Sequence, residues 1–340
     1  MNASGLRTPR LLQPVGAGRW GMAVALALAL GAILVVTAVA GHCELGSALG
    51  LGLVLTAVPE LPLTWRAALP MIGARALTVV VGGVIVSMVE SFPVLLAAVT
   101  VAATVFGAFV PMVGSTAGLT VVLIAIDLSA PGELVALWPY ATGAAVVVVA
   151  WAAWFGMARR MGRHRDEPEE VAGLRRGASG HAVRVAVAVG LAVWLASLLP
   201  RDLVGGHWLV TSVLLTVQPS QAQTGMRLVQ RLSGNSVGAL IAAVLLGFAP
   251  PAPVTIVVTV GLFFLAMALR PVNYIWWAIT GPPVLLVISE YPELFPWYEG
   301  GVRLAMNVAG ATIVVLVVFV APLVAVWWQR MRRSEPTDGP

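Results

Sequence analysis

Two arginines four residues apart, Arg227 and Arg231, lie in an otherwise strongly apolar part of the sequence. At this spacing both guanidinium groups fall on one face of a helix. A guanidinium group is permanently charged and binds a carboxylate through two parallel hydrogen bonds. One interpretation is therefore an electropositive vestibule that collects anionic solutes. The other is that both arginines only anchor a helix end at the lipid headgroups.

The residues before these arginines predict a break in a helix. The run from His207 to Val217 is apolar apart from three hydroxyl residues, and Gln218 and Pro219 follow it. Proline disfavours helix in the residue before it, so we expect the helix to end at Gln218 and to resume with Thr224 as its cap. Irregular backbone at membrane depth is tolerated only where it is buried in protein or lines a cavity. The polar residues of the break therefore either line a cavity or form an interfacial loop: Thr216, Gln218, Ser220 and Thr224.

Other residues suit packing or solute contact. Gly234 and Gly238 have the small-xxx-small spacing that lets two helices approach closely. Asn307 is a lone polar residue in the last apolar run, so it either bonds a neighbouring helix or touches a solute. Tyr274 and Trp277 belong to an aromatic cluster, which is either an interfacial belt or a surface that stacks planar aromatic solutes.

The sequence predicts no catalysis and no metal or cofactor. It has no lysine and hence no P-loop, and Ser236 in GNSVG sits in an apolar helical run, unlike the serine of a nucleophile elbow. Cys43, the one cysteine, makes with His42 too small a set for a structural zinc site. The apolar runs also hold no deeply placed carboxylate of the kind that couples transport to protons, which keeps a passive pathway open.

The elements that position these residues are membrane helices. Of the 340 residues, 59% are hydrophobic and only 10% are charged, whereas soluble domains carry about 25% charged residues. The net charge of +5 comes from arginines scattered between apolar runs, which argues against a nucleic-acid partner and for the lipid bilayer. The sequence predicts an all-α polytopic membrane protein.

About twelve transmembrane helices are expected, six on each side of a charged break. The first run is read as a span, since it is longer than the core of a signal peptide. The apolar runs lie near 21–40, 46–58, 71–89, 93–110, 113–127, 134–158, 182–199, 206–218, 232–249, 252–269, 272–289 and 302–328. The predicted parts are an N-terminal tail (1–20), a first six-helix repeat (21–158), a linker (159–181), a second six-helix repeat (182–328) and a C-terminal tail (329–340).

The apolar runs also predict the orientation of the chain in the membrane and an internal repeat. With a cytoplasmic N-terminus, eighteen of the 20 basic residues fall on the cytoplasmic side, and only Arg201 and Arg303 fall outside. Both termini, the linker and the tails are then cytoplasmic. Shifting the chain by 160 positions aligns Leu55–Thr64 with Leu215–Thr224. Because each half has an even number of spans, the repeats are expected to be parallel, with an axis along the membrane normal.

The second half resembles the fusaric acid resistance-like, or aromatic acid exporter, family of membrane transporters. Trp208–Ser220 and Thr224–Leu240 match its aromatic-led span, Gln-Pro-Ser turn, threonine, two arginines and Gly-x-x-x-Gly. Gly301–Ala311 resembles its last membrane segment, and the best match spans 203–328. The first half matches weakly: it has Pro70 near the place of the second arginine but keeps Pro59, Thr64, Arg66 and Gly73.

The resemblance implies efflux of small organic or aromatic carboxylic acids across a bacterial inner membrane. The expected partners are the bilayer and small organic anions, and a homo-oligomer stays open. Two alternatives are a passive organic-anion channel and a non-transporting membrane scaffold. The expected substrate path comprises Thr216, Gln218, Ser220, Thr224, Arg227, Arg231 and Asn307, with Tyr274 and Trp277 as stacking residues.

Overall fold

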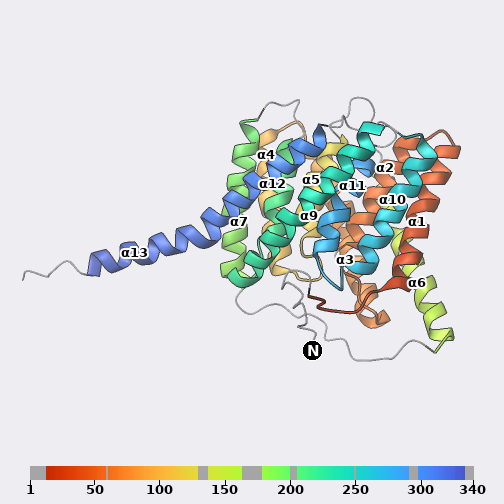
Figure 1. Cartoon of the computed structure of the whole chain (residues 1–340), viewed down its shortest axis with the longest axis horizontal. Helices are drawn as coiled ribbons and strands as arrows, with labels where there is room; N and C mark the ends of the chain where they lie inside the picture. The colour runs from red at the N-terminus through yellow and green to blue at the C-terminus, as the bar shows by residue number, and fades with distance from the viewer. Residues whose placement is uncertain are drawn as a thin grey trace, which may run out of the picture.

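The computed structural model describes residues 13–58, 60–128, 137–162, 178–199, 205–248, 250–290 and 298–333, and within these ranges it holds helices and no strand (Figure 1). Seven of the helices are long and apolar enough to cross a membrane. The chain is therefore a polytopic helical membrane protein, and the number of crossings stays a prediction. Pro59, Arg201, Glu293 and residues 163–177 of the predicted linker (159–181) lie outside the described residues.

Each predicted apolar run holds a helix. The first six are α1 (Trp20–Val39), α2 (Cys43–Ala57), α3 (Trp65–Val89), α4 (Pro93–Phe109), α5 (Thr116–Leu128) and α6 (Trp138–Arg160). The next five are α7 (Ala178–Ser197), α8 (Gly205–Thr216), α9 (Gln221–Phe248), α10 (Ala252–Leu269) and α11 (Ile275–Glu290). The last run holds α12 (Glu299–Val314), the π-helical η2 (Val315–Val320) and α13 (Ala321–Arg333), which extends away from the bundle (Figure 1).

The bundle has an inner and an outer layer. The short helices α2, α5, α8 and α11 lie at the centre, where α5 contacts the other three and α2 contacts α11, and most of their described side chains are buried. The longer helices surround them and keep one apolar face exposed, as helices that face lipid do. Since a 12-residue helix such as α8 is about 18 Å long and the hydrocarbon core is about 30 Å thick, α8 is too short to cross alone.

The two halves pack their helices in the same way. Helix α2 lies against α6 as α8 lies against α12, and α3 lies against α5 as α9 lies against α11. The halves also exchange contacts, because α1 lies on α10 and α4 lies on α7, at opposite edges of the bundle in Figure 1. This recurrence of partners is what a two-fold relation between the halves would produce.

A buried arginine and two glycines hold the first half together. The Arg75 guanidinium donates to the carbonyl oxygens of Met112 (3.1 Å), Glu60 (3.3 Å) and Thr56 (3.4 Å), which lie at or near helix ends. On α6, a Cβ at Gly143 would overlap the backbone of α2, and a Cβ at Gly52 on α2 would overlap the backbone of α6. The α2–α6 contact is therefore made backbone to backbone.

Residues 13–19, the described part of the predicted N-terminal tail, contact the helical bundle. The Val15 amide donates to the Val272 carbonyl (2.7 Å), and the Arg19 amide donates to the Ala268 carbonyl (3.0 Å). Residues 13–19 thus lie along the end of α10 and the connection that leads to α11.

Candidate functional site

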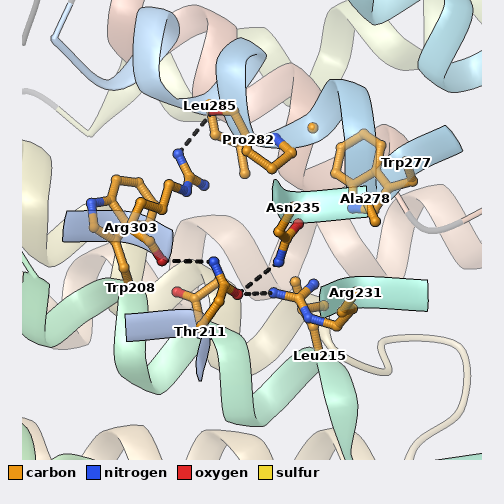
Figure 2. Close-up of a pocket in the computed structure, with 12 residues that line it drawn as sticks. Trp208, Thr211, Leu215, Arg231, Asn235, Trp277, Ala278, Pro282, Leu285 and Arg303 are labelled. Carbon is orange, nitrogen blue, oxygen red and sulfur yellow. Dashed lines mark hydrogen bonds between the residues drawn. The ribbon is translucent and has the colours of Figure 1, made fainter. Parts of the chain in front are cut away.

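A small polar cavity lies inside the second half, between α8, α9, α11 and α12 (Figure 2). We call it the chamber. Its volume is about 20 Å³, which is enough for roughly one water molecule. The chamber is therefore closed around its polar wall. That wall contains two arginines, two asparagines and two tryptophans: Arg231, Arg303, Asn235, Asn307, Trp208 and Trp277.

The asparagines and Arg231 form one hydrogen-bond network between α9 and α12. In Figure 2, bonds from Arg231 and Asn235 converge on one oxygen, the Oδ1 of Asn307, at 3.2 Å from Arg231 Nη2 and 2.7 Å from Asn235 Nδ2. The Asn307 Nδ2 donates in turn to the Arg303 carbonyl (2.8 Å). Arg231 is only 8% exposed. Its guanidinium thus lies inside the bundle, and the alternative of a headgroup anchor does not describe it.

Arg303 closes the opposite side of the chamber. Its Nη1 donates to the Pro282 carbonyl of α11 (2.8 Å), and its guanidinium carbon lies 3.7 Å from the centroid of the Trp208 ring. It is 5% exposed and, in the described part of the chain, forms no ion pair with Glu299 one turn earlier. The sequence placed Arg303 on the outer side of the membrane by its topology alone. The structure places its guanidinium on an aromatic ring in the chamber wall.

A second and wider cavity, about 310 Å³ in volume, lies between the two halves. We call it the vestibule. The first half contributes α4 and the α4–α5 connection, and the second half contributes α7, the end of α8 and the break that follows it. Gln218, Arg227, Arg270 and Tyr274 line its second-half side, and Thr104 and Ser115 are among the first-half residues that line it.

Tyr274 separates the vestibule from the chamber. It lines the vestibule, and its hydroxyl oxygen accepts a hydrogen bond from Nη1 of Arg231 (3.0 Å), which lines the chamber. Leu215 lines both cavities. The guanidinium carbon of Arg227 lies 3.5 Å from the centroid of the Tyr274 ring, and that of Arg270 lies 5.9 Å from it. Leu215, Arg231 and Tyr274 thus form a septum between the two spaces.

The septum lies in a positive field. Burial alone would raise the pKa of Tyr274, which sits in the connection between α10 and α11, but three nearby arginines outweigh burial and hold this pKa below its ordinary value. Burial lowers the pKa of Arg270 to about 10, with Tyr274 and Glu60 raising it and Arg227 lowering it. Arg270 therefore stays charged at neutral pH, and anions are the solutes that this field attracts.

The break between α8 and α9 is built by hydroxyl groups. The Ser220 Oγ accepts from the Gln223 amide (3.2 Å), so Ser220 and not Thr224 caps α9, and the predicted cap was wrong. Thr224 lies in the first turn, where its Oγ1 accepts from the Gln218 amide (3.0 Å) and donates to the Ser220 carbonyl (2.9 Å). Thr216 donates to the Ser212 carbonyl (2.6 Å). These three residues shape the break and are absent from the walls of both cavities.

Gly234 and Gly238 lie where α9 crosses α11. A Cβ at Gly234 would come within 2.5 Å of the Ala278 Cβ, and one at Gly238 would overlap the Ile279 carbonyl oxygen. This close crossing brings Arg231 and Asn235 beside α11 and so helps to form the chamber. Trp277, on the other side of the crossing, is 5% exposed and lines the chamber, whereas Trp276 is exposed. The interfacial-belt alternative therefore suits Trp276 and not Trp277.

Several residues in or beside the cavity walls were missed as site residues. Asn235 follows Arg231 by four residues and could have been found from that helical spacing. Gln230 donates to Asn273 Oδ1 (3.0 Å), both side chains being buried, and ties α9 to the start of α11. The sequence around Arg270 did not indicate a site residue, because the position of Arg270 beside the septum depends on the packing of α10 against α11.

A family model described as fusaric acid resistance protein-like matches residues 187–317. The match confirms the resemblance seen in the sequence, and it covers every residue that lines the chamber. It supports a role in membrane transport for this part of the chain. Comparison with curated proteins and with solved structures gives no match.

Proposed function

We propose that the protein exports small organic anions, aromatic carboxylates above all, across a bacterial inner membrane. The path runs from the vestibule through the septum into the chamber. One observation carries this proposal: two buried arginines and two tryptophans face a chamber in whose described wall there is no acidic side chain. The family match to residues 187–317 supports it.

The physical basis is the cost of buried charge. A charged group in the low-dielectric interior is expensive unless a partner compensates it. The hydrogen-bond acceptors of Arg231 and Arg303 in the described chain are neutral, and the buried Glu299 attracts Arg303 without a hydrogen bond to it. A carboxylate that entered the chamber would compensate both, since its two oxygens match the donor fork of a guanidinium.

The tryptophans favour a planar aromatic substituent on that carboxylate. Trp208 and Trp277 both line the chamber and are almost fully buried. Aromatic pairs in offset or edge-to-face contact gain about 0.5–1.5 kcal/mol beyond the area they bury. The chamber must widen to admit such a molecule, because it now has room for roughly one water molecule.

The charge distribution supports export as the direction of transport. The vestibule lies at the end of the bundle where the positive-inside rule places the cytoplasm, which suits uptake of anions from inside the cell and release outside. Two parallel six-helix repeats with both termini cytoplasmic fit the recurrence of helix partners in the halves. Oligomeric assembly is not needed to form either cavity, since one chain supplies both walls.

A passive anion channel is the second candidate. It is favoured by the described walls of both cavities, which contain no aspartate or glutamate to carry a coupling proton. Currents that follow the membrane potential and ignore a pH gradient would select this candidate.

Uptake of radiolabelled benzoate into liposomes that contain the purified protein tests the proposal, with and without a pH gradient. We expect saturable flux, its loss in Arg303→Gln, and its retention in Arg66→Gln, which removes an exposed arginine remote from both cavities. Flux no higher than in empty liposomes, or full flux in Arg303→Gln, would reject the proposed path.

A further inference from the structure

We propose that the vestibule is a second binding site for an organic carboxylate, held by Arg227 and Arg270 and arranged in series with the chamber. This inference rests on the proposed function, since it adds a second position to the same path. It assigns a role to the first half of the chain, which lies outside residues 187–317 and yet supplies one vestibule wall.

The vestibule has the space that the chamber lacks. Its volume of about 310 Å³ falls within the range of about 300–1,000 Å³ for pockets that hold small-molecule ligands. The chamber has room for roughly one water molecule. In the conformation that the structure shows, a benzoate-sized anion therefore fits in the vestibule and not in the chamber.

The vestibule also has an unsatisfied charged donor. The Nη1 atom of Arg270 is buried and has no hydrogen-bond partner in the described residues. A buried charged donor without a partner is costly, and a carboxylate oxygen is the partner it would accept most strongly. Glu60 acts on Arg270 from a distance, but it lies 3.9 Å from Arg19 and is absent from the wall.

Arg227 gives the site its second cation. It lines the vestibule, its guanidinium carbon lies 3.5 Å from the centroid of the Tyr274 ring, and that of Arg270 lies 5.9 Å from the same centroid. Two like charges around one ring repel each other, and an anion between them would remove that repulsion. The tyrosine ring offers a face on which the aromatic part of the anion could stack.

The residues that the first half contributes to the vestibule wall are uncharged and have small side chains. At Gly107 an added Cβ would overlap the Gly114 carbonyl oxygen, and Gly114 itself has φ +53°, a conformation that favours glycine. Thr104 and Ser115 place hydroxyl groups in the same wall. This wall leaves room for a solute and offers it neutral hydrogen-bond partners.

The septum makes the two positions distinct. Arg231 donates a hydrogen bond to the Tyr274 hydroxyl from the chamber side. On the vestibule side, Arg227 lies over the tyrosine ring and Arg270 lies farther from it. A carboxylate in the vestibule can therefore bind before the hydrogen bond between Arg231 and Tyr274 opens. Binding there should survive the loss of Arg231, while passage should not.

Thiol protection in the full-length protein tests this inference. Ser115→Cys places a single thiol in the vestibule wall once Cys43 is replaced by serine, and its reaction rate with N-ethylmaleimide is measured with and without benzoate. Benzoate at about ten times its Kd fills a site about 90% of the time, so it should slow labelling about tenfold. Ser220→Cys is the matched control, because Ser220 is exposed and outside the vestibule wall.

We expect protection to persist with Arg231→Gln, to disappear with Arg270→Gln and to return in part with Arg270→Lys, which restores the charge. Loss of protection with Arg231→Gln, or its persistence with Arg270→Gln, would overturn the inference. Normal benzoate flux with no protection of Cys at position 115 would also overturn it and leave the proposed function standing. Absence of both flux and protection in the wild-type background would reject the function and the inference together.

Discussion

The two halves of the chain place similar helices in similar contacts, but they differ in the side chains at the centre of those contacts. In the second half these side chains are large and polar or aromatic, and they line the chamber or the vestibule. At the positions 160 residues earlier, the first half has small or apolar residues, except that Arg75 corresponds to Asn235. The second-half residues are Trp208, Arg227, Arg231, Trp277, Arg303 and Asn307, and their counterparts are Ala48, Ala67, Met71, Ala117, Gly143 and Val147.

Under the proposed function, this difference separates a scaffold from a pathway. In the first half, α2 and α6 touch backbone to backbone at Gly143, so no polar space remains between them. In the second half, Arg303 occupies the corresponding position and a chamber lies between α8 and α12. The same framework thus either packs closely or opens, depending on the side chains at a few positions.

Each half also contains a buried arginine, and the two arginines differ in their hydrogen-bond partners. Arg75 is 2% exposed and donates to backbone carbonyls near helix ends. Arg231 donates to the side chains of Tyr274 and Asn307 in cavity walls. Burial alone therefore does not distinguish the two arginines, whereas the nature of their partners does, and this difference is the reason for proposing Arg231 and not Arg75 as a binding residue.

The largest effect is expected from opening the close contact in the first half. Gly143→Val would drive a branched side chain into the Leu49 carbonyl of α2. Overpacking costs about 1–3 kcal/mol when neighbours can shift, and backbone cannot shift as easily as a side chain. We expect loss of monodisperse protein on size exclusion. Gly190→Val is the control, since nothing lies within 4 Å of a Cβ there, and equal yields of the two variants would refute the close contact.

The next effect comes from making the second half resemble the first. Asn307→Val installs the residue found at position 147 and removes the acceptor shared by Arg231 and Asn235. Hydrogen bonds to charged groups contribute about 1.5–3 kcal/mol, so benzoate flux should fall about 10- to 100-fold. Val147→Ile is the matched change in the first half and should leave flux unaltered. The pathway assignment fails if both variants transport at the wild-type rate.

A smaller effect is expected from Trp208→Ala, which installs the residue found at position 48. Loss of one aromatic contact costs about 0.5–1.5 kcal/mol, so the KM for benzoate should rise up to about tenfold. The KM for acetate, which has no ring, should change little. The comparison of the two KM values in liposomes checks this, and an equal rise for both anions would contradict stacking on Trp208.

The smallest effect is expected at the septum. Tyr274→Phe keeps the ring beside Arg227 and removes the hydroxyl that Arg231 holds. A weaker septum should let the two cavities communicate more often, so benzoate flux should rise a few-fold. Stopped-flow uptake measures the rate, with Tyr298→Phe as a control remote from both cavities. A large fall in flux would mean that the hydroxyl binds solute and does not close the path.

Local sequence patterns were enough to predict the positions of most helices. Hydropathy located the twelve runs, because each membrane helix must satisfy its own backbone and carry apolar side chains. Proline chemistry located the break after α8, which ends at Thr216. Helix α9 begins at Gln221, well before its apolar run at 232, because its first turns are polar and hydropathy does not detect them.

The site was only partly predictable, because it depends on contacts between distant segments. Arg231 and Asn307 were singled out from sequence, yet the hydrogen bond that joins them links residues 76 positions apart. Arg303 was expected near the outer end of its helix, and its place on Trp208 depends on how α12 packs against α8. Arg227 gave no sign that it would lie on Tyr274, because that contact requires the α10–α11 connection to fold against α9.

The most direct test compares Arg75→Gln with Arg231→Gln in liposomes, with benzoate flux expressed per folded molecule and stability followed as Tm. If the first half is scaffold and the second half is pathway, Arg75→Gln should lower Tm and keep the wild-type KM and flux. Arg231→Gln should lower flux at least about tenfold, as loss of a charged hydrogen-bond partner implies. Equal loss of flux per folded molecule in both variants, or full flux in Arg231→Gln, would contradict this division.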